Sequence, residues 1–594
     1  MSNVQFLTLS SGTNSFWGNF FLQNRIVSGA IIILIYILAM SLMAFLLSGY
    51  IKKLYLGEPN IMDPISGRLV TFFEKIFGES KEKTMKFREY FLNLLLFNAA
   101  AGIMTFLVLY FQNLLPFSAG YSHFSLSLTF NTVTSFLTNT NLQHYSNPMQ
   151  LTYFSQTFVI TGLMFVGAGT GFAASMAFIR GIIQDKGFLG NFYHDFLVSI
   201  FYLLLPLSLG LTLILLIFGV PETLSSSMVV HILGSHGTTT IPLGPVATLE
   251  GIKNIGTNGG GFYGANAGFP FENPNWFTNL SEFVGFTLIP LASIFSLGKV
   301  FNNKGFSNML FGVVIAIFIF TTFMTYFGEY AGIPALSSLG TLYTGNMLGK
   351  ETALGISQSS IFATGAVFTS TGAGNSVLLA FTPVGILGVM GNLLLNDPIG
   401  GVGVGIMNLF MFVIFTTFIT SLMVGKLPEL MSLKLSSREI KYSTLSLATH
   451  PLLVLIPFGV TMLLPGLIAG FPGTRPDAIT SVLYEFGSAA ANNGSEMGGF
   501  LTNQAYFNYL DGIVMLLGRF LLIGFQLVIA ESFSNKSPKV EFGRSINPSS
   551  LLYGLMLFTV MILLGVLSFF PILALGPFLS WAHDFSLYIG GAIL

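Results

Sequence analysis

The chain has 594 residues, of which 52% are hydrophobic and only 8% are charged, and its formal net charge is zero. Soluble domains carry about 25% charged residues, so the composition predicts a polytopic protein embedded in a lipid bilayer. The neutral charge does not indicate a nucleic-acid partner, and the lack of cysteine excludes disulfides, iron–sulfur clusters and thiolate metal sites. Residues 1–25 hold one basic residue, Arg25, and no clear apolar core, so no cleaved signal peptide is expected.

Ten apolar stretches are long enough to cross a bilayer, which takes roughly 20 residues. They are 26–50, 89–112, 152–179, 195–219, 279–298, 308–330, 402–425, 446–469, 511–531 and 551–575. Most basic residues fall in alternate loops between these stretches, beginning with 51–88 and including Lys426, Lys539 and Arg544. The positive-inside bias places those loops in the cytoplasm and both termini outside it.

Four polar, glycine-rich stretches recur on the opposite side, each between two predicted spans and each preceded by a segment too short to cross the membrane. They are Asn131–Gln143, Gly256–Asn275, Phe368–Asn375 and Ala491–Gly499. They repeat about every 120 residues, and a fixed internal period indicates a repeated architectural unit. Since backbone without helical structure at membrane depth must face protein or an aqueous path, we expect each stretch to line a pore.

The predicted fold is therefore an all-α membrane protein with about ten transmembrane helices. Four pseudo-symmetric modules, each a span, a re-entrant pore loop and a second span, surround a selectivity filter, with one extra helix at each end. The modules occupy 89–190, 191–305, 306–440 and 441–548. An outer N-terminal extension (1–25) and the first helix with its cytoplasmic loop (26–88) precede them, and the last helix with an outer tail (549–594) follows.

Each stretch contains a triplet of residues that offers oxygen ligands. The predicted filter residues are Asn139, Thr140, Asn141, Thr257, Asn258, Gly259, Ser370, Thr371, Gly372, Asn492, Asn493 and Gly494. Glycine and asparagine tolerate left-handed φ, so such strands can direct backbone carbonyls, with hydroxyl and amide oxygens, at one point. No acidic residue lies in the triplets, where a divalent ion would favour one. These neutral dipoles predict a weakly hydrated monovalent cation, with potassium as the natural candidate, and no covalently bound cofactor.

Several motifs together resemble the KdpA family, the potassium-binding subunits of the bacterial Kdp potassium-transporting ATPase. The motifs are Asn139–Gln143, Gly256–Phe262, Phe271–Pro274, Gly349–Glu351 and Asn492–Ser495, and the similarity extends over roughly residues 26 to 575. The resemblance implies a potassium-transporter fold in the bacterial plasma (inner) membrane. It also implies a subunit that selects extracellular potassium and passes it through an intramembrane tunnel to a P-type ATPase partner, in a complex with small accessory membrane subunits.

Outside the triplets, six residues are candidates for the ion path. Gln143 and Glu496 flank the first and fourth triplets and are interpreted as the filter mouth, although an ordinary loop amide and an incidental surface acid are the simpler readings. Arg519 lies inside the ninth span, where a charge is costly, so we expect it to line the tunnel or to pair with a carboxylate. The glycines of the seventh span are interpreted as a broken helix that gates below the filter, or as close-packing residues: Gly401, Gly403 and Gly405.

The chain itself is not expected to be an enzyme. The Asp-Lys-Thr-Gly phosphorylation motif of P-type ATPases is absent, and the nearest Walker-like stretch, Gly345–Thr352, has the wrong spacing. ATP hydrolysis is therefore assigned to a partner subunit. The alternative function is a stand-alone potassium channel or symporter of the Trk/Ktr/HKT type, which shares the four-module plan but usually has eight core spans.

Overall fold

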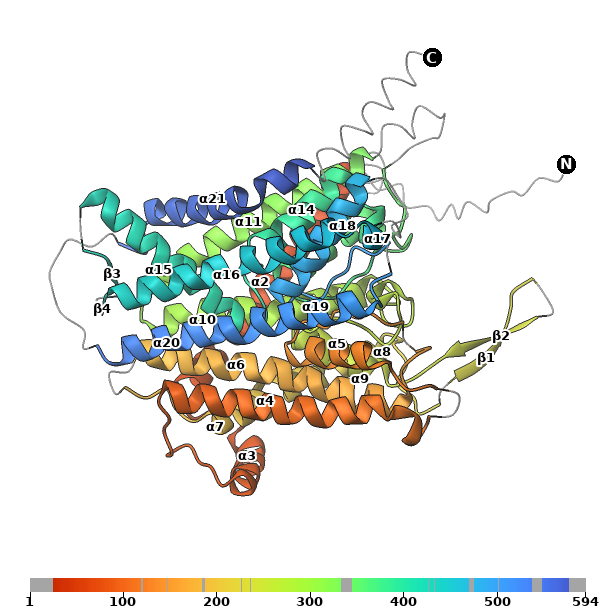
Figure 1. Ribbon diagram of the computed structural model, residues 1–594, viewed down its shortest axis with the longest axis horizontal. Helices are drawn as coiled ribbons and strands as arrows, with labels where there is room; N and C mark the ends of the chain where they lie inside the picture. Colours follow the sequence, from red (N-terminus) through yellow and green to blue (C-terminus); the bar gives the residue numbers. More distant parts are fainter. Residues whose placement is uncertain are drawn as a thin grey trace, which may run out of the picture.

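The computed structural model describes residues 25–575 except 119–120, 147, 184–186, 226, 235–236, 333–344, 426, 432, 469–474, 500 and 537–546. The predicted N-terminal extension and outer tail lie almost entirely outside the described residues, as do Lys426, Lys539 and Arg544. Within the described part, ten helices are long and apolar enough to cross a membrane, which confirms the predicted number of spans (Figure 1).

Seven of the ten spans are single helices: α2 (Arg25–Leu56), α4 (Phe87–Tyr110), α10 (Trp276–Val300), α11 (Lys304–Ala331), α15 (Val404–Val424), α16 (Ser437–Met462) and α21 (Leu551–Leu575). Three contain a π-helical turn: η2–α6 (Ser155–Ile160 and Thr161–Ile183), α7–η3–α8 (Phe192–Val198, Ser199–Leu204 and Leu205–Ile217) and α19–η6–α20 (Ala505–Leu516, Leu517–Leu521 and Leu522–Ser534). The eighth span begins earlier than expected because Ser436 and Glu439 form a capping box within the polar loop.

A short helix precedes each glycine-rich stretch. These pore helices are α5 (Leu126–Leu137), α9 (Val246–Ile255), α13 (Gly355–Phe368) and α18 (Arg475–Ala491). With 10 to 17 residues each, they extend roughly 15–26 Å at 1.5 Å per residue, less than the roughly 30 Å hydrocarbon core. Each lies between two spans in sequence, so the re-entrant plan recurs four times.

The second span of each module forms the centre of the molecule. In these four spans, 67–83% of the most apolar segment is buried, against 28–50% in the first spans of the modules. The extra helices α2 and α21 are also mostly exposed, because α2 packs on α10 while α21 packs on α11 and α15 at the periphery. A central helix is covered by other helices on most faces, whereas a peripheral helix presents an apolar face to lipid.

The third module differs from the others because its second span is broken. Helix α14 (Pro383–Leu394) begins with the Thr382 hydroxyl accepting from the Gly385 N–H and with proline at its first position. It ends after 12 residues, and a buried, non-helical segment, 395–403, separates it from α15. Pro398 and the positive φ of Asn396 and Asp397 prevent a continuous helix.

Smaller elements lie at the two ends and along one side of the helix bundle (Figure 1). At one end is the short hairpin of β3 (Glu429–Leu430) and β4 (Leu433–Lys434), while α3 (Asp63–Phe77) packs beside α7 on the side of the bundle. From the other end projects an antiparallel hairpin in which β1 (Ser227–His231) pairs with β2 (Thr238–Pro242). The remaining elements are η1 (Gln112–Leu114), η4 (Asn266–Gly268), η5 (Leu378–Ala380) and α17 (Pro465–Ile468).

Candidate functional site

The four pore helices end in the same hydrogen-bonded motif, and the predicted triplets begin at its turn. In every module the N–H of the first triplet residue donates to the carbonyl three residues earlier, at 3.2 Å. The N–H of the second residue donates to the carbonyl five residues earlier at 2.8–2.9 Å, from Thr140, Asn258, Thr371 and Asn493. This is a Schellman helix end, so the negative end of each helix dipole points toward its triplet.

The triplets adopt backbone conformations that are rare for residues with a side chain. φ is positive at the first residue of all four and at the third residue of three, namely Asn139, Asn141, Thr257, Gly259, Ser370, Asn492 and Gly494. The middle residue of each triplet does not have a positive φ. This alternation of φ turns successive carbonyl oxygens toward the same side of the strand. Thr257, at φ 47°, is β-branched and therefore strained, as residues at ligand-binding sites often are.

The twelve triplet residues meet in a closed ring, called here the triplet ring. A Cβ atom added to Gly259 would lie 2.3 Å from the Cα of Gly372. One added to Gly372 would lie 2.8 Å from Gly494, and one added to Gly494 only 1.7 Å from the Thr140 carbonyl oxygen. Asn141 closes the ring, because its Nδ2 donates to the Gly259 carbonyl at 3.1 Å. Only residues without a Cβ allow the strands this approach.

Hydrogen bonds join the first three modules around the ring. Asn139 donates from Nδ2 to the Thr257 carbonyl at 2.9 Å, which ties the first triplet to the second. The Gly372 N–H donates to the Asn258 carbonyl at 3.0 Å, which ties the second to the third. All four groups are buried, so each bond also satisfies a polar atom that has lost water.

The fourth module completes the circle. The Ser370 hydroxyl donates to the Ala491 carbonyl at 2.9 Å and lies 3.0 Å from the Asn492 carbonyl oxygen. Asn492 in turn donates from Nδ2 to the Thr140 hydroxyl at 2.9 Å, which returns to the first module. The structure thus brings all twelve predicted filter residues together, in the cyclic order of the modules.

A cavity of about 240 Å³ lies against one side of the triplet ring, and both residues predicted for the filter mouth line it. Gln143 bridges two modules there, since its Oε1 accepts from the Gly261 N–H at 3.1 Å and its Nε2 donates to the Tyr145 hydroxyl at 3.0 Å. Burial and the nearby charge of Glu485 raise the pKa of the Glu496 carboxyl to about 8. Glu496 is therefore a partly buried acid rather than an ordinary surface residue.

The segment between α14 and α15 lies directly against the other side of the ring. The Val402 N–H donates to the Thr257 hydroxyl at 2.9 Å, and a Cβ on Gly401 would lie 3.0 Å from the same oxygen. Gly403, at φ 78°, packs on the backbone of Gly171 in α6, where a Cβ would lie 2.2 Å from the carbonyl oxygen. Gly405 lies in the first turn of α15, one residue past its start.

Arg519 reaches the same region from the fourth module. Its side chain is buried, and its Nη2 donates to the Gly167 carbonyl in α6 at 2.9 Å. A Cβ on Gly171 would lie 2.5 Å from Nη2 and 2.6 Å from the Val402 carbonyl oxygen, so the guanidinium lies beside the broken segment. Among the described residues no carboxylate pairs with it within 4.0 Å, so the expected ion pair is not formed there.

Two buried lysines hold the loops behind the ring. Lys253 of α9 lies 2.6 Å from a Glu250 carboxylate oxygen and 3.7 Å from Glu272. Glu272 also accepts from the Tyr263 N–H at 2.7 Å, so the Phe271–Pro274 motif fastens the strand that leaves the second triplet. Because a buried charge requires a partner, these contacts indicate structural support rather than ion binding.

The third module carries the equivalent support. Lys350 lies 2.7 Å from a Glu329 carboxylate oxygen, and both side chains are fully buried. The other Glu329 oxygen accepts from the Thr382 N–H at 2.7 Å, just before α14 begins. The sequence singled out Lys350 only as part of a motif, because its partner Glu329 lies 21 residues earlier in the chain.

One functional-site residue was not predicted as such. Asp397 lies in the broken segment, and its Oδ2 accepts from Nδ2 of Asn493 at 3.3 Å, which connects that segment to the fourth triplet. No local pattern points to this contact, because Asn493 lies 96 positions later in the chain. The side chain of Asp397 is buried.

Comparisons with known proteins show the family to which the chain belongs. A family model described as KdpA, the potassium-transporting ATPase A subunit, matches residues 33–581. The chain is 62% identical over 574 residues to a Thermoplasma acidophilum protein named potassium-transporting ATPase potassium-binding subunit, covering 97% of this chain and 98% of the relative. Proteins of the same name from Thermoplasma volcanium (62% over 578 residues; 97% and 98%) and Caldanaerobacter subterraneus (39% over 535 residues; 89% and 95%) are also similar. With a match over nearly its whole length, the chain belongs to the KdpA family of potassium-transporting ATPase A subunits.

Proposed function

We propose that the chain is the potassium-binding subunit of an ATP-driven potassium pump and that the triplet ring selects the ion. The observation that carries the proposal is the fourfold recurrence of one geometry: a Schellman helix end followed by a strand of the ring, with left-handed φ at its first residue. A single loop of this kind is weak evidence. Four of them in contact surround one axis with carbonyl oxygens and helix dipoles.

The ligand set favours potassium over smaller or divalent ions. The ring offers backbone carbonyls with the hydroxyl and amide oxygens of residues such as Thr140, Ser370 and Asn493, and none of the twelve residues is acidic. Neutral oxygens replace the loosely held water of potassium at modest cost, whereas magnesium or calcium prefers carboxylates. Gln143 and Glu496 form the mouth of the ring on the extracellular side.

Below the ring the ion does not pass straight through in this proposal. The broken segment 395–403 is buried directly against the second triplet, with Val402 bonded to Thr257 and Gly401 beside it. The Arg519 guanidinium adds a positive charge at the same depth. Potassium is therefore directed sideways, and Gly401, Gly403 and Gly405 are the gate residues around which the segment moves.

The partner that receives the ion is a P-type ATPase subunit, assisted by small accessory membrane subunits. ATP hydrolysis lies in that partner, since this chain has no Asp-Lys-Thr-Gly motif. The orientation follows the basic loops, which places the end of the bundle with the β3–β4 hairpin in the cytoplasm and both termini outside it. The module boundaries are those predicted from the repeats, 89–190, 191–305, 306–440 and 441–548.

Replacing Gly259 with aspartate tests the filter. The residue has φ 109° and lies against Gly372, so an acidic side chain there distorts the ring and adds charge to a neutral ligand set. We expect the reconstituted complex to lose discrimination of potassium from sodium and ammonium in uptake assays. Unchanged ion preference would contradict the assignment of the triplet ring as the selectivity filter.

Expression of the chain without partner subunits separates the pump subunit from the stand-alone channel. A subunit that delivers its ion to a partner gives no ATPase activity and little potassium uptake alone. Robust uptake by this chain in proteoliposomes would instead assign it to the Trk/Ktr/HKT type of transporter.

A further inference from the structure

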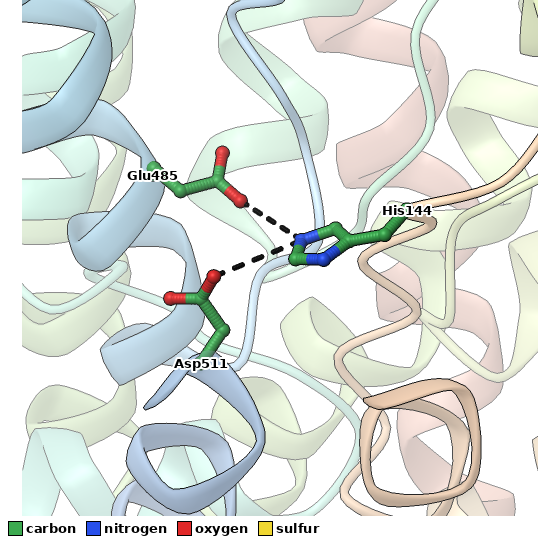
Figure 2. Close-up of side chains that lie close together, drawn as sticks. All are labelled: His144, Glu485 and Asp511. Carbon is green, nitrogen blue, oxygen red and sulfur yellow. Dashed lines mark hydrogen bonds and ion pairs between the residues drawn. The ribbon is translucent and has the colours of Figure 1, made fainter. Parts of the chain in front are cut away.

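A cluster of buried titratable side chains lies outside the triplet ring, between the first and fourth modules (Figure 2). His144 follows Gln143 in the strand that leaves the first triplet, Glu485 lies on pore helix α18, and Asp511 lies on α19. The three side chains are at most 1% exposed. They come from segments far apart in the sequence, and Figure 2 shows them directed at a common point.

The hydrogen bonds around His144 determine which ring nitrogen faces the two acids. Nδ1 lies 2.7 Å from Oδ1 of Asn508. The Nδ2 of the same amide donates to Ser127 and Asn503, so its Oδ1 is the acceptor and Nδ1 of His144 carries the proton. In the neutral ring, Nε2 therefore presents a lone pair to the carboxylates. A histidine whose second nitrogen is held in this way is typical of a metal ligand.

The two distances from Nε2 of His144 are close to the spacing of ligand atoms in a tetrahedral coordination shell. Nε2 of His144 lies 3.2 Å from Oε1 of Glu485 and 3.7 Å from Oδ2 of Asp511, and one ligand atom from each residue falls within 4.8 Å of the others. Zinc binds histidine nitrogen and carboxylate oxygen at about 2.0–2.2 Å, which places tetrahedral ligand atoms roughly 3.3–3.6 Å apart. A small movement of the Asp511 side chain completes the fit.

The two buried carboxylates of the cluster, Glu485 and Asp511, require a cation to neutralise them. Neither carboxylate oxygen of Asp511 has a hydrogen-bond partner, although the side chain is fully buried. The comparable acids behind the second and third triplets, Glu250 and Glu329, each contact a lysine ammonium. Among the described residues, no lysine or arginine forms an ion pair with Glu485 or Asp511. One divalent ion neutralises two carboxylates while leaving the imidazole neutral.

We propose that His144, Glu485 and Asp511 bind one divalent metal ion of the zinc class. Nitrogen and oxygen donors without thiolate suit zinc and neighbouring first-row divalent ions. The ion ties the strand leaving the first triplet to the pore helix and second span of the fourth module. The ion thereby stabilises the contact between the first and fourth modules. Lys253 and Lys350 stabilise the loops of the second and third modules in the same way.

The direct test is the metal content of the complex with its partner subunits, purified without metal-chelating resin and equilibrated with micromolar Zn²⁺. Mass spectrometry of the metals should find about one zinc per chain that resists washing. Asp511→Asn should lose this ion. Glu282→Gln is the matched control, because Glu282 is also a buried acid in a membrane span whose oxygens lack hydrogen-bond partners, and it should retain the ion.

A graded variant probes the histidine. Asn508→Ala removes the acceptor that orients His144 and leaves all three ligands in place. Loss of such an outer contact should weaken zinc binding about 10- to 100-fold, measured by competition with a chelating dye. Binding as tight as that of the unmodified chain would contradict a site at His144.

A measurement on the unmodified complex does not depend on the folding of any variant. Removal of metal by a strong chelator should lower the midpoint of thermal unfolding, and Zn²⁺ should restore it, with a difference of about 2–4 °C. Replacement with Co²⁺ should produce the visible absorption of a tetrahedral nitrogen–oxygen site. If no metal is retained and Zn²⁺ leaves the midpoint unchanged, a protonated His144 holds the acids and the proposal is overturned. It is equally overturned if zinc persists in Asp511→Asn.

Discussion

Asn492 of the fourth module donates a hydrogen bond from Nδ2 to the hydroxyl of Thr140 in the first module, at 2.9 Å. The two residues are 352 positions apart, and their contact closes the ring that the other three junctions leave open. The same Nδ2 lies 2.9 Å from the Met515 carbonyl oxygen, so one amide links the triplet ring to the second span of its module.

Removing this amide should therefore weaken potassium binding. Asn492→Ala removes two buried hydrogen bonds, at about 1–3 kcal/mol in total, and roughly a tenfold rise in the half-saturating potassium concentration corresponds to about 1.4 kcal/mol. The measurement is potassium-stimulated ATP hydrolysis by the assembled complex. Asn98→Ala is the control, because Asn98 bonds to Thr170 inside the bundle and, among the described contacts, forms no hydrogen bond with a triplet residue. An equal effect of both variants would indicate a general loss of packing.

Two glycines of the fourth module separate backbone strain from steric fit. Gly494 and Gly498 both have positive φ, 93° and 80°, so alanine is strained at either position. Only at Gly494 does a Cβ meet other atoms, 1.7 Å from the Thr140 carbonyl oxygen. We expect Gly494→Ala to abolish selective potassium stimulation, while Gly498→Ala lowers thermal stability by about 1 kcal/mol and preserves ion preference. Loss of selectivity in both would contradict the close contact of the strands.

Arg519 should influence passage of the ion rather than its selection. Its guanidinium bonds to Gly167 and lies beside Val402, and no hydrogen bond joins it to a triplet residue among the described contacts. Arg519→Gln should slow rubidium uptake by the reconstituted complex while the half-saturating potassium concentration changes less than about twofold. Arg519→Lys, which keeps the charge, should be intermediate. A shift in ion preference would place the side chain in the filter.

Glu272 should make stability depend on pH. Burial, followed by the charge of Glu250, raises the pKa of its carboxyl to about 8 although Lys253 opposes the shift. The folded chain then binds the proton more tightly than the unfolded chain, whose carboxyl has a pKa of about 4.3, so this group's contribution to stability falls as the pH rises toward 8. Relative to Glu272→Gln, the thermal midpoint of the unmodified protein should fall between pH 6 and pH 9. Glu82→Gln, at an exposed position, keeps Glu272, so its midpoint should follow that of the unmodified protein at every pH. A constant difference between the unmodified protein and Glu272→Gln across this pH range would refute the assignment.

The spans and the repeated plan could be predicted because they are local properties of the sequence. Apolar stretches of at least 20 residues mark the spans, and glycine-rich polar stretches between them mark the re-entrant loops. The limits of the eighth span were wrong because a capping box at Ser436 and Glu439 extends α16 into polar sequence. Helix α14 was missed because its 12 residues are too few to be recognised as a span.

The contacts behind the triplet ring could not be predicted, since they depend on how the modules are placed around the axis. Asp397 and Asn493, or His144 and Asp511, lie in different modules, and no local pattern indicates that they meet. The β1–β2 hairpin was also missed, because a short exposed pair of strands leaves little hydrophobic pattern in a loop. Composition and periodicity locate elements, whereas the partner of a buried charge emerges only from packing.

The position of a bound ion tests the central claim most directly. A structure of the complete complex, determined in rubidium by anomalous scattering, shows where a potassium analogue binds. The account predicts rubidium at the centre of the ring formed by Asn139–Asn141, Thr257–Gly259, Ser370–Gly372 and Asn492–Gly494, coordinated by oxygens of all four strands. Rubidium bound elsewhere in the chain, with no ion between these strands, would contradict it.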